Sequence, residues 1–161
     1  MNDDQKHCYL FALEIVPLEV GRAYRTLPMH CTLMHRFWSD VKPADLVAQT
    51  KPLFSRYTQG ITFVPGHVVE LGPNKTVVFE LENIGELRKL HLELFELLKR
   101  LGVNYTEDDW VGPGYTPHAS VREDSPLAEG AAFTCKQVNL IEVKVPGHDQ
   151  ERFVREKIAL G

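Results

Sequence analysis

Two short segments of the chain carry the same pattern, a histidine followed two residues later by a hydroxyl. HCTL begins at His30 and contains Thr32, and HASV begins at His118 and contains Ser120. Side chains alternate between the two faces of a strand, so each histidine would share a face with its hydroxyl. Arg122 continues the alternation of the second segment. Each strand would thus present an imidazole and a hydroxyl on one side and small or apolar residues on the other.

These groups suit a reaction at phosphorus. Two imidazoles titrate near neutral pH, so one can accept a proton while the other donates one. Two hydroxyls and a guanidinium can donate hydrogen bonds to the non-bridging oxygens of a phosphate. Burying these polar groups without hydrogen-bond partners would be costly. A solvent-filled cleft that binds an anion would provide such partners. If the two polar faces meet across such a cleft, an in-line attack on phosphorus finds a base on one side and an acid on the other.

Other residues near the two motifs are assigned less central roles. No carboxylate or thiol stands at a useful offset for a zinc site with His30, His35 and His118, so we expect neither a metal nor another cofactor. His35 is expected on the strand face opposite to His30, as a packing or surface residue. Tyr115 is expected to line the rim of the cleft and contact the substrate, and Arg25 to add positive charge. The aromatic residues considered for stacking on a base are Tyr9, Phe11, Phe37, Trp38, Trp110 and Tyr115.

Composition and charge bear on the class of partner. The 161 residues are 43% hydrophobic and 25% charged, as in an ordinary globular protein, and the net charge is −4. A protein that binds a long nucleic acid usually has a basic face, whereas this chain has no basic run and carries the acidic segment TEDDW at 106–110. A nucleotide or short RNA, held by a few local cations, is therefore favoured over a long polyanion.

Cysteine usage and hydropathy bear on localisation. The three cysteines have no metal-like spacing, which favours free buried thiols in a reducing compartment. The first residues are polar and acidic, unlike a signal peptide, and no stretch approaches the roughly 20 apolar residues of a membrane span. We therefore expect a cytoplasmic protein that has no membrane partner.

The elements that would position the motifs follow an α+β pattern. The sequence predicts helices at 18–25, from residue 43 with a kink or break at Pro52, and at 85–101, where leucines recur at helical spacing before Gly102. Strands are expected at 7–15, 29–35, 61–71, 76–81, 118–122, 133–145 and 151–158, the last two joined by a turn at 146–149. Each motif strand follows a helix, which is a weak internal duplication. Residues 1–161 are expected to form one domain with two lobes.

The two tetrapeptides resemble the signature of the 2H phosphoesterase superfamily, which includes the 2′-5′ RNA ligases, also described as RNA 2′,3′-cyclic phosphodiesterases. The segment YLFALEIVP and Pro117, which precedes the second histidine, are also similar to that family. The resemblance implies a bilobal α+β fold with pseudo-two-fold symmetry, in which antiparallel sheets surround a central cleft and helices pack outside. It also implies metal-independent hydrolysis of a ribose 2′,3′-cyclic phosphate or a related nucleotide or RNA phosphodiester.

The resemblance assigns roles to the motif residues. His30 and His118 would be the base and the acid, in an order that depends on which ribose oxygen leaves. Thr32 and Ser120 would hold the phosphoryl oxygens, with Arg122 as a further phosphate contact. RNA ligation, the reverse class of reaction, ranks below hydrolysis, and a monomer is expected for a bilobal cleft. The alternatives are a non-catalytic module of the same fold that binds nucleotides or RNA terminal phosphates, and a structural or regulatory protein.

Overall fold

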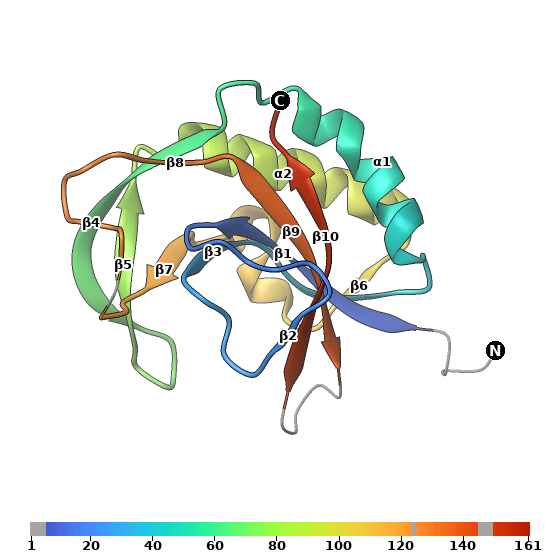
Figure 1. The fold of residues 1–161 in the computed structure, drawn as a ribbon, viewed down its shortest axis with the longest axis horizontal. Coiled ribbons are helices and arrows are strands. Elements are labelled where there is room, and N and C mark those ends of the chain that lie inside the picture. Colours follow the sequence, from blue (N-terminus) through green and yellow to red (C-terminus); the bar gives the residue numbers. More distant parts are fainter. Residues whose placement is uncertain (1–5, 124, 145–149) are drawn as a thin grey trace.

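The computed structural model describes residues 6–123, 125–144 and 150–161 (Figure 1). Two α-helices, α1 (Pro43–Ser55) and α2 (Gly85–Arg100), are accompanied by two 3-10 turns, η2 (Asp108–Trp110) and η3 (Gly112–Gly114). The strands are β1 (His7–Glu14), β2 (Ala23–Tyr24), β3 (His30–Ser39), β4 (Ile61–Leu71), β5 (Thr76–Glu82), β6 (Asn104–Tyr105), β7 (His118–Ser120), β8 (Phe133–Cys135), β9 (Gln137–Lys144) and β10 (Glu151–Ala159). None of the helices described is long and apolar enough to cross a membrane.

The strands form one hydrogen-bonded path in the order β2-β10-β9-β1-β3-β7-β5-β4-β8, and β6 pairs with β3 beside it. All pairings between the described strands are antiparallel. The two motif strands, β3 and β7, are neighbours in the middle of this path, where the β1–β9–β10 side meets the β4–β5 side. The predicted α+β class with antiparallel strands is therefore confirmed.

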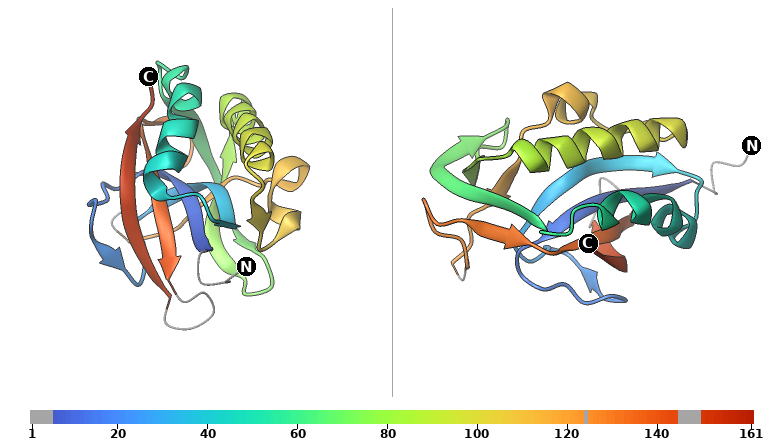
Figure 2. Two further views of the ribbon diagram at one scale, coloured as in Figure 1. Left: turned by 90° about the vertical axis from the view of Figure 1, so that its right-hand side faces the viewer. Right: turned by 90° about the horizontal axis from the view of Figure 1, so that it is seen from above.

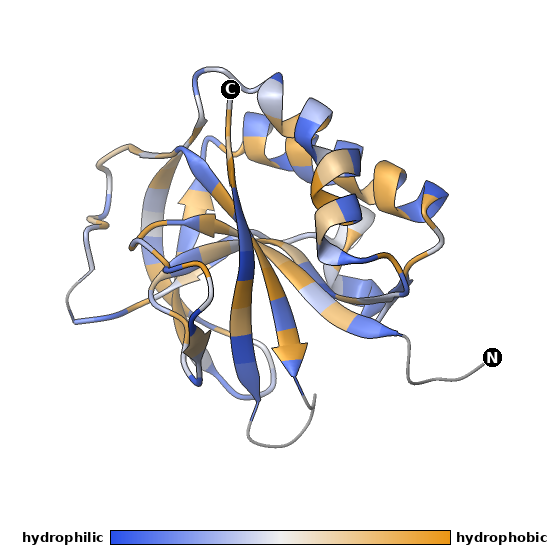
Figure 3. Ribbon diagram, turned by 45° about the vertical axis from the view of Figure 1, so that its right-hand side comes forward, coloured by the Kyte–Doolittle hydropathy of each residue, from blue (hydrophilic) through white to orange (hydrophobic). Residues whose placement is uncertain are grey.

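Both helices cover the same face of the sheet (Figure 2), where α1 packs against β10 and α2 against β3 and β4. Alternate residues of β1, Tyr9, Phe11 and Leu13, join the core beneath these helices. The intervening residues, such as Leu10 and Ala12, belong to a second cluster on the other face. Because β1 is buried on both faces, its sequence is a nearly continuous apolar run. Along the helices and other strands, by contrast, hydrophobic and hydrophilic residues alternate (Figure 3).

Three predicted elements differ from the structure. Residues 18–25 contain no helix, because Gly21 adopts a left-handed φ of +86° and the segment instead forms β2 against β10. Pro52 does not break α1, since it lies in the last turn and removes only one intrahelical hydrogen bond. The strand expected at 133–145 is divided at Lys136 into β8 and β9, which pair with different neighbours. The predicted turn at 146–149 lies outside the described residues.

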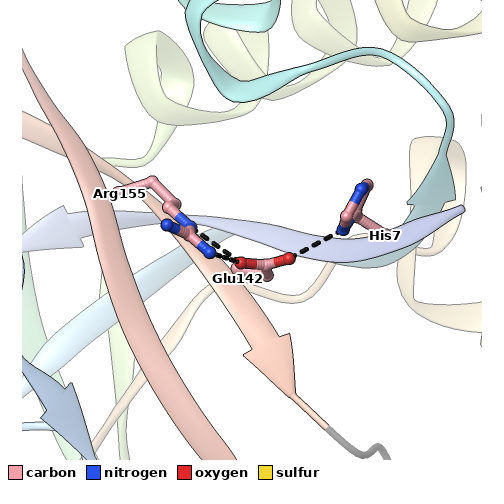
Figure 4. A network of polar contacts seen from close by, with 3 residues as sticks. All are labelled: His7, Glu142 and Arg155. Atoms are coloured by element: carbon pink, nitrogen blue, oxygen red, sulfur yellow. Dashed lines mark hydrogen bonds and ion pairs between the residues drawn. The ribbon is translucent and has the colours of Figure 1, made fainter. Parts of the chain in front are cut away.

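A buried carboxylate connects three strands (Figure 4). Glu142 on β9 is 6% exposed, and its Oε1 atom lies 2.9 Å from Nδ1 of His7 on β1. Nε of Arg155 on β10 donates to Oε2 at 2.7 Å. Burial alone would raise the pKa of Glu142, but the hydrogen bonds and charges of Arg155 and His7 lower it. The network therefore stabilises the order β1–β9–β10 beside the motif strands.

Candidate active site

The two motifs lie on neighbouring antiparallel strands. Cys31 on β3 is paired with Ala119 on β7, and both are fully buried. Because successive side chains alternate between faces, the histidine and the hydroxyl of each motif lie on the other, less buried face. Antiparallel register then sets the histidine of each motif opposite the hydroxyl of the other, about 4.5–5.5 Å apart at Cβ. Extending the Cys31–Ala119 register by one residue in each direction sets His30 opposite Ser120 and Thr32 opposite His118.

Both motif histidines are oriented by the same backbone contact. Nδ1 of His30 lies 2.9 Å from the carbonyl oxygen of Pro28, and Nδ1 of His118 lies 2.9 Å from that of Thr116. A carbonyl oxygen only accepts, so Nδ1 carries the proton in each ring. In the neutral form Nε2 is therefore the free basic atom of both imidazoles.

The environment of His30 favours its neutral form. Burial lowers the pKa of His30, and the nearby charges of Arg152, Arg122 and His118 lower it further. The hydrogen bond to Pro28 acts in the opposite direction without reversing the shift. At neutral pH His30 is thus unprotonated, which is the state that a general base requires.

One side of the cleft is a cavity of about 440 Å³ that we call the arginine pocket. His30 and Thr32 line it, and so does Arg122, although β7 ends at Ser120 before reaching it. Three further arginines line it: Arg25 and Arg36, which lie close to the first motif in the sequence, and Arg152, which comes from a distant part of the chain. Of these, sequence reasoning identified only Arg25. Arg152 belongs to β10, which pairs with β9 as the sequence predicted and also with β2, which the sequence did not predict.

The other side of the cleft is a cavity of about 570 Å³ that we call the tryptophan pocket. It is lined by His118 and Trp110, and it shares His35 and Glu107 with the arginine pocket. Among the aromatic residues considered for base stacking, Trp110 is the one that lines a pocket of this cleft. The others lie in or against the cores, namely Tyr9, Phe11, Phe37, Trp38 and Tyr115.

The predicted placement of His35 on the face opposite to His30 is wrong. Two consecutive residues of β1 pair with Thr32 and Met34, so one extra residue, Leu33, is inserted in β3. Leu33 and Met34 are both fully buried, and His35 returns to the cleft face. Such a bulge changes the phase of alternation. Burial, followed by the nearby charges of His118 and other cations, lowers the pKa of His35 to about 4.

The prediction that Tyr115 lines the rim is also wrong. Its side chain is 3% exposed, and its ring stacks on that of His91 with 3.7 Å between centroids. The Tyr115 hydroxyl donates to the carbonyl oxygen of Thr32 at 2.8 Å. His91 in turn contacts the carbonyl oxygen of Leu33 through Nδ1 at 2.7 Å and accepts from the amide of Gly112 at Nε2, at 2.8 Å. This buried pair joins β3 to the segment that leads into β7.

Replacing Tyr115 with phenylalanine tests this position. We expect the free energy of unfolding to fall by about 1 kcal/mol, because one buried hydrogen bond to Thr32 is lost. The Michaelis constant for substrate should stay within about twofold, since removing a group that does not touch substrate leaves binding unchanged. Urea unfolding and steady-state kinetics measure the two quantities. A Michaelis constant raised about tenfold at unchanged stability would instead place the hydroxyl at the rim.

Comparisons with known proteins agree with this architecture. Residues 14–149 match the model of the 2′-5′ RNA ligase superfamily. No curated protein matches the chain. Escherichia coli LigT complexed with 3′-AMP has a TM-score of 0.60 at 15% identity, covering 96% of this chain and 98% of that chain. LigT complexed with NADP+ has a TM-score of 0.59 at 15% identity, covering 97% and 98%. A protein of Thermus thermophilus has a TM-score of 0.53 at 15% identity, covering 95% and 97%.

Proposed function

Because the chain belongs to the 2′-5′ RNA ligase superfamily, a group of 2H phosphoesterases, we propose that it hydrolyses a ribose 2′,3′-cyclic phosphate or a related nucleotide or RNA phosphodiester. The observation that carries the proposal is the β3–β7 register, which sets each motif histidine opposite the hydroxyl of the other motif. A phosphorus atom held between the strands has an imidazole and a hydroxyl on either side.

In the proposed reaction, His30 acts as the base and His118 as the acid. Nε2 of His30 takes a proton from water while the water oxygen forms a bond to phosphorus. His118 enters the step as an imidazolium, with protons on both ring nitrogens. As the bond between phosphorus and one ribose oxygen breaks, Nε2 of His118 donates its proton to that oxygen. The lowered pKa of His30 supports this order, since it keeps that ring unprotonated at neutral pH. The product is a ribose monophosphate, and the two histidines exchange roles if the opposite ribose oxygen leaves.

The hydroxyls and one arginine stabilise the charge on the phosphoryl group. Thr32 and Ser120 donate hydrogen bonds to the non-bridging oxygens, where negative charge accumulates as water attacks. Arg122, which lines the arginine pocket, supplies a positive charge next to the same oxygens. None of these steps uses a metal or another cofactor. The complexes of LigT with 3′-AMP and NADP+ support a nucleotide as the substrate class.

The proposal predicts turnover that does not require a metal. The protein is incubated with a nucleoside 2′,3′-cyclic phosphate, with and without EDTA, and the product is identified by mass as the monophosphate that has gained one water. We expect the same rate in both samples, because histidines supply both proton transfers. Loss of activity with EDTA would overturn the mechanism. Thermal stabilisation by the nucleotide without any product would identify a binding module instead.

A further inference from the structure

The arginine pocket carries more positive charge than one cyclic phosphodiester requires. Four guanidinium groups and a single carboxylate, that of Glu107, line it, although the whole chain has a net charge of −4. A cyclic phosphodiester has one negative charge, and Arg122 beside the motif residues can balance it. The remaining positive charge of the pocket is thus available to a second anionic group.

Arg36 and Arg152 hold the more buried part of this charge. Both side chains are half-buried, and both donate to Oε1 of Gln150, at 3.4 Å and 3.3 Å respectively. Within the described part of the chain, Arg36 has one carboxylate partner, Glu107 at 3.7 Å, and Arg152 has none. Arg152 also donates to the carbonyl oxygen of Arg25 at 2.6 Å. Each guanidinium has five N–H donors, so these contacts leave donors free on both.

Without a bound anion, the guanidinium groups of Arg36 and Arg152 repel each other. Burial and the charge of Arg36 both lower the pKa of Arg152. Like charges repel strongly where they are partly removed from water. An anion bound between the two guanidinium groups attracts both of them and offsets this repulsion. Forked guanidinium groups also match the geometry of phosphate oxygens better than an ammonium group does.

We propose that Arg36 and Arg152 form a subsite for a second phosphoryl group of the substrate, distinct from the phosphodiester that reacts. This inference rests on the proposed function. For a ribose 2′,3′-cyclic phosphate, the second group is carried by the 5′ oxygen. It is either the terminal phosphate of a nucleotide or the backbone phosphate that precedes an RNA 3′ end. The substrate class is therefore a 5′-phosphorylated ribose 2′,3′-cyclic phosphate.

The test compares substrates that differ only at the 5′ oxygen. The values of kcat/KM are measured for a nucleoside 2′,3′-cyclic phosphate with a 5′-hydroxyl, for the same molecule with a 5′-phosphate, and for a dinucleotide that ends in the cyclic phosphate. We expect the wild-type protein to prefer the 5′-phosphorylated substrates by about tenfold or more, because charge-assisted hydrogen bonds are involved. Preference for the dinucleotide over the 5′-phosphate would identify an RNA end, and the reverse preference a mononucleotide.

Arg36→Gln and Arg152→Gln are expected to reduce that preference ratio to within about twofold. Arg100→Gln is the matched control, since this exposed arginine ends α2 and lines neither pocket of the cleft. It should keep the ratio of the wild-type protein. Two variants are used because Arg152 also contacts the backbone at Arg25, and melting temperatures show that each is folded. Equal turnover of all three substrates by the wild-type protein would overturn the subsite and leave the proposed function intact. A loss by the same factor on every substrate would also overturn it.

If no substrate is hydrolysed, a binding measurement still tests the Arg36–Arg152 subsite independently of the proposed hydrolysis. Affinities are measured at about 0.15 M salt, near physiological ionic strength, for a nucleoside 3′,5′-bisphosphate and for the matching 3′-monophosphate. Tighter binding of the bisphosphate by the wild-type protein, lost in both arginine variants, supports the subsite even where the proposed hydrolysis fails. Equal affinities for the two nucleotides would overturn the subsite.

Discussion

Replacing either His30 or His118 with alanine is expected to lower kcat for a nucleoside 2′,3′-cyclic phosphate by about 10² or more. Each variant removes one of the two proton transfers, and general acid or base catalysis contributes about this factor. Both side chains lie on the less buried face of their strands, so the core beneath them is preserved. Steady-state kinetics, together with a thermal unfolding curve for each variant, measure the effect.

A matched control and a double variant sharpen this result. His67→Ala removes an exposed histidine on β4 that lines neither pocket of the cleft, and it should retain wild-type activity. The double variant should lose little more than the stronger single variant, because residues that act in one step are not additive. Full activity in either single variant would remove that histidine from the mechanism. Independent, multiplicative losses would indicate two separate steps.

The sequence alone predicts which side chains of each motif share a face, because side chains alternate between the two faces of a strand. Each motif places a polar pair on one face and small or apolar residues on the other, and burial of Cys31 and Ala119 agrees with that prediction. Sequence does not show which strands become neighbours. The pairing of β3 with β7 is a long-range contact, so the convergence of the two motifs could only be inferred from their resemblance to a family.

The predictions for His35 and Tyr115 are wrong for local structural reasons that the residue types alone do not indicate. The prediction for His35 rests on strict alternation, which fails after the bulge at Leu33. A pair of adjacent buried residues, Leu33 and Met34, is consistent with such a bulge, but it also occurs in strands buried on both faces. The prediction for Tyr115 rests on its place in a long loop, whereas η3 folds this loop back against α2 and buries the ring on His91.

The net charge of the chain does not predict the local charge of the arginine pocket. The chain is acidic overall, yet four arginines from well-separated segments meet at one cavity. Arg36 lies on the first motif strand itself, β3, whereas Arg152 follows more than thirty residues after the second histidine. Pairing of β10 with both β9 and β2 brings it back to the cleft. An acidic composition therefore disfavours a long polyanion without excluding a strongly cationic pocket for a short one.

His91→Leu is expected to lower the free energy of unfolding at pH 7 by about 2–6 kcal/mol. The side chain is fully buried on α2, with one hydrogen bond at each ring nitrogen. Leucine fills much of the same volume but leaves the carbonyl of Leu33 and the amide of Gly112 buried without partners, at roughly 1–3 kcal/mol each. Urea unfolding measures the loss. His67→Leu is the exposed control, and its effect should stay within about 0.5 kcal/mol.

The same histidine makes stability depend on pH in a defined direction. Burial, with a contribution from the charge of Arg88, lowers the pKa of His91 to about 4, despite the hydrogen bond to Leu33. In the unfolded chain the pKa is about 6.5, so between these values the unfolded state binds a proton that the folded state does not. The contribution is therefore complete above about pH 6.5 and is lost as the pH falls towards 4, by up to about 3 kcal/mol.

His91→Leu should accordingly flatten, though not abolish, the fall in stability between pH 6.5 and 4. Burial also lowers the pKa values of His30 and His35, so they contribute with the same sign in the variant. Urea unfolding at several pH values compares the slopes of the two proteins. A variant that kept the wild-type slope would show that His91 takes up its proton over the same pH range in the folded and the unfolded protein, which contradicts the lowered pKa. Below pH 6.5, Nε2 would then be a second donor facing the amide of Gly112, and the contact that connects α2 to the loop before β7 would be lost on acidification.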